Sequence, residues 1–133
     1  MKKLLTLLLI TSILAGCSKK KDETVPIDMT LKTYSVQAPY RSLSVILQLK
    51  FKTDGTVTLS EYPTNEFVDL KYEIGDTKAP TTTLKIHGEL SKSFYPDGLT
   101  KGTKINWETT VSRLSYNAEI RGFTIGDYRF IAD

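Results

Sequence analysis

The sequence predicts an all-β fold of seven or eight short antiparallel strands, arranged as a small meander barrel or as a β-sandwich. Apolar and polar residues alternate with a period of two in several segments, which is the pattern of half-buried strands. Glycines and prolines separate these segments. No segment longer than one turn shows the spacing of apolar residues that a helix requires.

The clearest strand covers residues 43–52, and it is followed by a turn at Asp54-Gly55 and a second strand at residues 57–60. Only Ile46 breaks the alternation in the first strand. Two strands separated by such a turn predict a β-hairpin. The apolar residues of one parity are Leu43, Val45, Leu47, Leu49 and Phe51, and those of the second strand are Val57 and Leu59.

The pattern also predicts the register of this hairpin. A two-residue loop would place polar side chains beside the apolar face, whereas a three-residue loop over residues 53–55 pairs Phe51 with Val57 and Leu49 with Leu59. The third position of such a loop is left-handed, and Gly55 adopts that conformation without steric cost. We therefore expect a type I turn with a glycine bulge.

The remaining strands follow in order along the chain, and the longest loop is expected over residues 91–104 because it contains Pro96-Asp97-Gly98 and Gly102. A first strand is expected within residues 29–36. The later ones are identified by alternating residues: Val68, Leu70, Tyr72 and Ile74; Thr82, Leu84, Ile86 and Leu90; Ile105, Trp107, Thr109 and Val111; Tyr116, Ala118 and Ile120; and Tyr128, Phe130 and Ile131.

Three runs resemble the meander of the lipocalin-like domains found in small bacterial lipoproteins. They are Leu49-Lys50-Phe51 with Asp54-Gly55-Thr56-Val57, Tyr72-Glu73-Ile74, and Leu84-Lys85-Ile86. The resemblance covers about half of the domain and implies a meander barrel. The glycine-x-tryptophan mark of true lipocalins is missing from the first strand, and the only tryptophan is Trp107. A ligand cavity is therefore not implied.

The N-terminus has the pattern of a secretion signal. Lys2 and Lys3 precede an apolar run of about 12 residues, which is shorter than the roughly 20 residues that a transmembrane helix needs. The run ends in Leu14-Ala15-Gly16-Cys17, which resembles the lipobox of bacterial lipoproteins. That resemblance implies a diacylglyceryl group on the Cys17 sulfur, and buried acyl chains would hold the protein on a membrane.

These features divide the chain into a cleaved signal peptide (residues 1–16), a lipidated cysteine with a flexible tether (residues 17–28) and one all-β domain (residues 29–133). The tether is charged and has few apolar residues, which is typical of segments that do not fold alone. Ser18 and the acid-containing Lys21-Asp22-Glu23 resemble sorting signals of outer-membrane lipoproteins. We expect an outer-membrane location, at the periplasmic face or the cell surface.

Composition argues against several classes of function. The chain has 18 Lys+Arg and 15 Asp+Glu, and removal of Lys2 and Lys3 leaves 16 against 15 with the signs interleaved. No basic stripe remains for nucleic acid. Cys17 is the only cysteine and His87 the only histidine, so neither a disulfide nor a metal or other cofactor site is expected.

Aromatic residues in loops form the candidate binding surface: Tyr40 beside Pro39, Tyr62 beside Pro63, and Phe94 and Tyr95 in the longest loop. Such residues contribute to recognition surfaces. The alternative is that they plug the open ends of the β-fold.

We expect a non-catalytic binding or interaction domain held at the membrane through the lipid on Cys17. Its ligand would be a small apolar molecule, a glycan or an envelope protein. The alternative is an accessory subunit that docks on a larger outer-membrane assembly through strand edges or aromatic loops. A small envelope enzyme is the third option, and it would require His87 to meet a carboxylate and a hydroxyl group.

Overall fold

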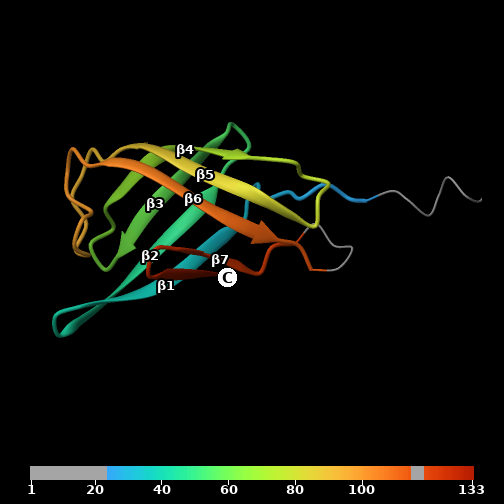
Figure 1. Cartoon of the computed structure of the whole chain (residues 1–133). Coiled ribbons are helices and arrows are strands. Elements are labelled where there is room, and N and C mark those ends of the chain that lie inside the picture. Colours follow the sequence, from blue (N-terminus) through green and yellow to red (C-terminus); the bar gives the residue numbers. More distant parts are fainter. Residues whose placement is uncertain (1–23, 115–118) are drawn as a thin grey trace, which may run out of the picture.

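A computed structural model describes residues 24–114 and 119–133, and it confirms the expected all-β fold (Figure 1). These residues form one eight-stranded antiparallel sheet in the order β6-β5-β4-β3-β2-β1-β8-β7. The strands are β1 (Thr33–Tyr40), β2 (Leu43–Phe51), β3 (Thr56–Tyr62), β4 (Phe67–Ile74), β5 (Thr81–Glu89), β6 (Lys104–Ser112), β7 (Gly122–Ile125) and β8 (Tyr128–Ala132).

The sheet curls into a nearly closed barrel, which decides between the barrel and the sandwich. Its two edge strands, β6 and β7, come to lie side by side. The Thr109 hydroxyl on β6 donates a hydrogen bond to the Thr124 carbonyl on β7 at 2.6 Å. Within the described residues no strand ladder joins β6 to β7, so this seam is the one place where the wall is not continuously hydrogen-bonded.

The β2–β3 hairpin has the register that the sequence predicts. Phe51 pairs with Val57 and Leu49 with Leu59. The Lys52 amide donates to the Thr56 carbonyl at 2.9 Å, which leaves residues 53–55 as the loop. Gly55 has a φ of 82°, the left-handed conformation that this loop requires.

The barrel interior is filled by side chains from the alternating positions. Leu47, Leu49 and Phe51 are fully buried, as are Leu59 and Leu84 on neighbouring strands. Together with the other apolar residues of this parity they form one contiguous core.

Aromatic rings pack closely at one side of this core. The Tyr34 ring centroid lies 5.7 Å from that of Phe51 and 5.0 Å from that of Phe123, which stacks on Phe130 at 5.6 Å. The buried Tyr34 hydroxyl donates to the Ile120 carbonyl at 3.0 Å. Burial, with a smaller contribution from the Glu119 charge, raises the pKa of Tyr34 to about 12.

Two strands differ from the sequence prediction. The first strand begins at Thr33 because Leu31, with a φ of 62°, lies in a turn closed by the Lys32 amide and the Met29 carbonyl. Of the strand expected over residues 116–120, the described residues 119 and 120 are not in a strand, and β7 covers Gly122–Ile125. Ile120 is buried, but its carbonyl accepts the Tyr34 hydroxyl. Residues 116–118 lie outside the described residues.

The domain includes residues that the sequence assigned to the tether. Ile27 is buried in the core, and its amide donates to the Thr77 carbonyl at 2.8 Å. The Arg113 guanidinium donates to the carbonyls of Val25, Thr77 and Ala79. Arg113 therefore fastens the incoming chain to the β4–β5 loop, and we call this end of the barrel the proximal end.

Candidate binding surface at the distal end

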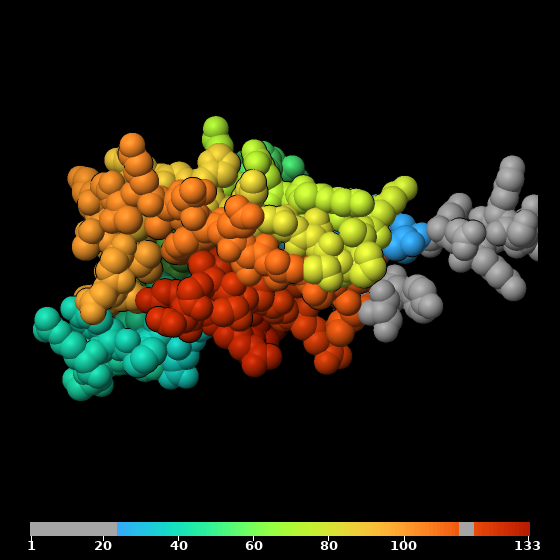
Figure 2. Space-filling model, in the orientation of Figure 1, coloured from blue at the N-terminus to red at the C-terminus, as the bar shows by residue number. Residues whose placement is uncertain are grey.

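The end of the barrel opposite the incoming chain carries four connections: β1–β2, β3–β4, β5–β6 and β7–β8 (Figure 1). We call it the distal end. In the space-filling view the β1–β2 hairpin and the β5–β6 loop lie together at this end, while the N-terminal segment leaves at the other (Figure 2). Three of the four aromatic residues singled out in the sequence are exposed or half-buried here.

Tyr40 and Tyr95 come together although they are far apart in the chain. Their rings stack with centroids 5.6 Å apart and an interplanar angle of 11°. The Arg41 guanidinium lies 5.3 Å from the Tyr40 ring centroid, within cation–π range. Tyr40 is the last residue of β1 and not a loop residue as expected.

Leu43 shows how far the β1–β2 hairpin projects. It has the parity of the core residues of β2 and pairs with Tyr40, yet it is 58% exposed. The hairpin extends beyond the end of the core, so its inward face is left open to solvent. Leu43, the first residue of the strand that was expected to be half-buried, is therefore exposed to solvent.

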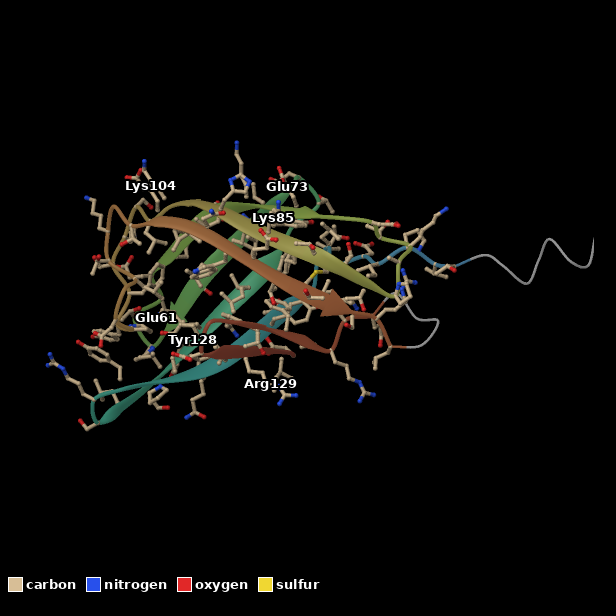
Figure 3. The ribbon with its side chains drawn as sticks, in the orientation of Figure 1. Glu61, Glu73, Lys85, Lys104, Tyr128 and Arg129 are labelled. Carbon is tan, nitrogen blue, oxygen red and sulfur yellow. The ribbon has the colours of Figure 1, made fainter. Side chains whose placement is uncertain are left out.

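A buried carboxylate fixes the position of the β5–β6 loop. Glu61 lies on the inward face of β3, is 2% exposed and stands at the distal end (Figure 3). Its side chain accepts the Tyr95 amide at 2.8 Å and the Thr64 hydroxyl at 3.0 Å. A carboxylate buried in this way is stabilised by hydrogen bonds. Glu61 is not among the candidate residues that the sequence pattern predicts, although it shares the parity of Val57 and Leu59, which indicates an inward position.

A second group lies on the outer face of the sheet near the same end, and we call it the outer patch: Ile46, Tyr62 and Phe67. Tyr62 is 61% exposed and pairs directly with Ile46 on β2. Phe67 is the first residue of β4, is 56% exposed and pairs with Ser60, two residues from Tyr62 on the same face of β3. The Lys92 ammonium lies 5.8 Å from the Phe67 ring and 2.7 Å from the Glu66 carboxylate. The outer patch is thus apolar at its centre and charged at its rim.

Phe94 does not belong to this surface. It is only 5% exposed, and its amide donates to the Leu99 carbonyl at 2.7 Å. Its ring packs into the core cluster and covers the distal end of the barrel. Phe94 therefore follows the alternative expectation, in which a loop aromatic residue fills the open end of the barrel.

The His87 side chain is half-exposed on the outer face, with Nε2 3.9 Å from the Glu73 carboxylate. No hydroxyl group of the described residues is hydrogen-bonded to it, so the arrangement that an enzyme would need is not assembled there. Across residues 24–114 and 119–133 there is no group of three or more His, Cys, Asp or Glu side chains that could hold a metal ion.

Cys17 lies outside the described residues. Among those that are described, no helix has the length and hydrophobicity to cross a bilayer. No protein-family model, curated protein or solved structure matches the chain.

Proposed function

We propose that this protein is a lipid-anchored envelope protein that binds a protein partner through the distal end of its barrel. In this proposal the signal sequence exports the chain, Cys17 carries the lipid, and the domain has no catalytic role. The proposal combines two of the expected functions, because an accessory subunit is an interaction protein with a fixed partner.

The observation that carries the proposal is that the incoming chain and most of the exposed apolar residues lie at opposite ends of the barrel. The segment that leads to Cys17 is fastened at the proximal end by Arg113 and by the pairing of Ile27 with Thr77. Of the eight large exposed apolar residues in the described part of the chain, five lie toward the distal end: Leu43, Ile46, Tyr62, Phe67 and Tyr95. A domain anchored through Cys17 would therefore present these residues away from the bilayer.

The filled interior favours an external surface over a ligand inside the barrel. Fully buried aliphatic and aromatic residues occupy the centre, and Phe94 covers the distal end. Small-ligand sites are concave and largely preformed. A container would require the rings of Tyr34, Phe51, Phe123 and Phe130 to move out of contact.

The chemistry of the outer patch favours a protein over a glycan. Tyrosine, phenylalanine and arginine are enriched in protein interfaces, where an apolar centre is surrounded by a polar rim. Ile46, Tyr62 and Phe67 supply such a centre, and Lys92 with Glu66 supplies part of the rim. Ile46 and Leu43 offer aliphatic surface that suits an apolar side chain better than a sugar.

The proposed location is the outer membrane, at the periplasmic face or the cell surface. It is supported by Ser18 after the lipidated cysteine and by Lys21-Asp22-Glu23, which resemble sorting signals. Membrane fractionation of cells that express the full chain tests this part. Recovery of the protein wholly in the inner-membrane fraction would overturn the location.

Site-specific photo-crosslinking in living cells tests the binding surface. A photoreactive phenylalanine analogue replaces Tyr62 or Phe67 in the full chain, and Leu31 at the proximal end, 73% exposed, provides the control. We expect one discrete protein adduct from positions 62 and 67 and none from position 31. The adduct at position 67 should disappear when Tyr62→Ala is introduced. Equal adducts from all three positions, or a glycan adduct only, would overturn the proposed partner.

A further inference from the structure

A groove with two arginines follows the barrel seam on the outer face of β6, β7 and β8. It has a volume of about 700 Å³ and is lined by Thr109, Thr110, Arg121, Gly122, Phe123, Thr124, Arg129 and Ile131. This volume lies within the range of roughly 300–1,000 Å³ that small-ligand sites occupy. In Figure 2 β6 and the β7–β8 hairpin lie side by side on the face turned to the viewer.

The local sequence explains why the wall is hollow at this point. Gly122 lies at the start of β7, where a Cβ atom would come within 2.4 Å of the Phe130 carbonyl oxygen. The position therefore cannot carry a side chain without a backbone shift. Within the described residues β6 and β7 share no ladder, and the groove follows the line where the Thr109 side chain bonds the Thr124 carbonyl.

The groove is positively charged. Arg121 and Arg129 are its only charged lining residues. Within the described part of the chain neither guanidinium has a carboxylate within 4 Å, since the ion pairs there involve lysines and His87. Arg129 points outward from β8, on the opposite side of the barrel from Glu73 and Lys85 (Figure 3).

Three acidic residues of the neighbouring segments line another groove or have partners outside this one. Glu119 and Asp133 line a separate groove of about 170 Å³ that shares Arg121, and the Asp133 carboxylate accepts the Ser35 hydroxyl at 2.6 Å. Glu108 on β6 lies 3.9 Å from Lys85, toward β5. The seam groove itself therefore contains no acidic side chain.

Hydroxyl groups complete the donor set. Thr110 and Thr124 have outward-facing side chains beside the two arginines. The Thr109 hydroxyl is already bonded to the Thr124 carbonyl. Guanidinium groups bind carboxylates and phosphates through paired, charge-assisted hydrogen bonds, and threonine hydroxyls can add further donors to the same oxygens.

We propose that the seam groove binds an anionic ligand of small-molecule size, which presents a phosphate or a carboxylate group to Arg121 and Arg129. This site is independent of the distal surface, because it lies on the barrel wall and uses different residues. An apolar part of the ligand would lie over the exposed Ile131 side chain.

Calorimetric titration of the full-length lipidated protein in nanodiscs tests the site. Glucose 6-phosphate supplies the phosphate, glucuronate the carboxylate, and glucose is the neutral control at the same ionic strength. We expect saturable binding of at least one charged sugar and none of glucose. Whichever sugar binds identifies the anionic group.

Matched variants decide whether the arginines carry the binding. Arg121→Gln and Arg129→Gln should each weaken it by about 10-fold or more, because each removes the charge-assisted hydrogen bonds of one guanidinium group. The double variant should abolish it. Lys71→Gln, which removes an exposed cation on the outer face of β4, should leave it unchanged.

Chemical-shift mapping on the wild-type protein gives a second measurement that does not depend on variants. The amides of residues 122–124 and 129–131 should shift during the titration with the charged sugar. The proposal is overturned if neither charged sugar binds, if the double variant binds normally, if Lys71→Gln weakens binding equally, or if the shifts centre elsewhere.

Discussion

Glu61 is the residue on which the distal end most depends. Its buried carboxylate accepts the Tyr95 amide and the Thr64 hydroxyl, and Tyr95 in turn stacks on Tyr40. Glu61→Ala would leave the Tyr95 amide without its acceptor. We expect a loss of about 1–3 kcal/mol in the free energy of unfolding, measured by urea denaturation.

Glu61→Gln is the matched variant, because its amide oxygen can still accept one of the two donors. Its loss should be smaller than that of Glu61→Ala. An alanine variant as stable as the wild type would contradict the role given to this carboxylate.

Tyr34 makes stability depend on pH in the alkaline range. Its pKa rises from the ordinary value of 10.0 to about 12, mainly through burial. A pKa raised in the folded state means that the neutral phenol stabilises the fold. This contribution is complete below about pH 10 and is lost as the pH rises through about 12.

Tyr34→Phe should therefore reduce the fall in stability between these pH values. Thermal unfolding followed at several alkaline pH values measures this slope. Tyr62→Phe, at a 61% exposed site, is the control and should keep the wild-type slope. An unchanged slope in Tyr34→Phe would contradict the assignment.

Two glycines act on single elements in different ways. Gly55 has a φ of 82°, and an added Cβ would have no atom within 4 Å. Gly55→Ala should therefore lower the free energy of unfolding only by the strain of holding alanine in the left-handed conformation, about 1–2 kcal/mol. At Gly122 the added Cβ would meet the Phe130 carbonyl oxygen, so the β7–β8 hairpin must shift. We expect Gly122→Ala to lower the melting temperature more than Gly55→Ala. The reverse order would contradict the close approach of β7 and β8.

Arg113 holds the N-terminal segment against the β4–β5 loop through three carbonyls. Arg113→Ala should open this segment locally while the barrel remains folded, because the core strands do not use this side chain. Hydrogen exchange should show faster exchange of the Ile27 amide, by about tenfold for each 1.4 kcal/mol lost.

Arg113→Lys provides the graded control. A lysine keeps the charge but cannot span several carbonyls with a planar group, so its effect should be intermediate. Equal protection of Ile27 in all three proteins would show that Arg113 does not fasten the chain.

The strands could be predicted wherever one face is buried. The pattern of residues 43–60 predicts both strands and their register correctly, because a shift by one residue would expose Leu49 and Phe51. The predicted burial and the predicted strand start are wrong where a residue fits the local pattern but lies outside the core of the folded barrel. Leu43 continues the alternation but lies beyond the end of the core, and the turn at Leu31 delays β1.

The candidate surface could be predicted only in part. Aromatic residues in or beside loops identified Tyr40, Tyr62 and Tyr95, but their burial depends on how distant loops pack. Phe94 and Tyr95 are neighbours in the chain, yet one enters the core and the other stacks on Tyr40. The seam groove joins β6 to the β7–β8 hairpin, of which the sequence predicts β8 but not β7, so the sequence alone does not indicate the groove.

At the scale of the whole molecule, the proposed lipid anchor implies an orientation of the barrel on the membrane. If Cys17 carries the lipid, the chain reaches the barrel at the proximal end, so the distal end faces away from the bilayer. A strand of nine residues is about 30 Å long, and a tilt of about 40° to the barrel axis makes the two ends differ in height by roughly 20–25 Å if the barrel stands upright.

Energy transfer to an acceptor in the lipid headgroups tests this orientation, because it reports which end of the barrel lies closer to the bilayer. Single labels are placed at Lys78→Cys in the β4–β5 loop or at Tyr62→Cys in the outer patch of the full-length protein in vesicles. A lipidated Cys17 cannot react with the label. We predict membrane association, no labelling of the protein without an added cysteine, and stronger transfer from position 78 than from position 62. Labelling of Cys17 itself, or equal transfer from both positions, would contradict the account.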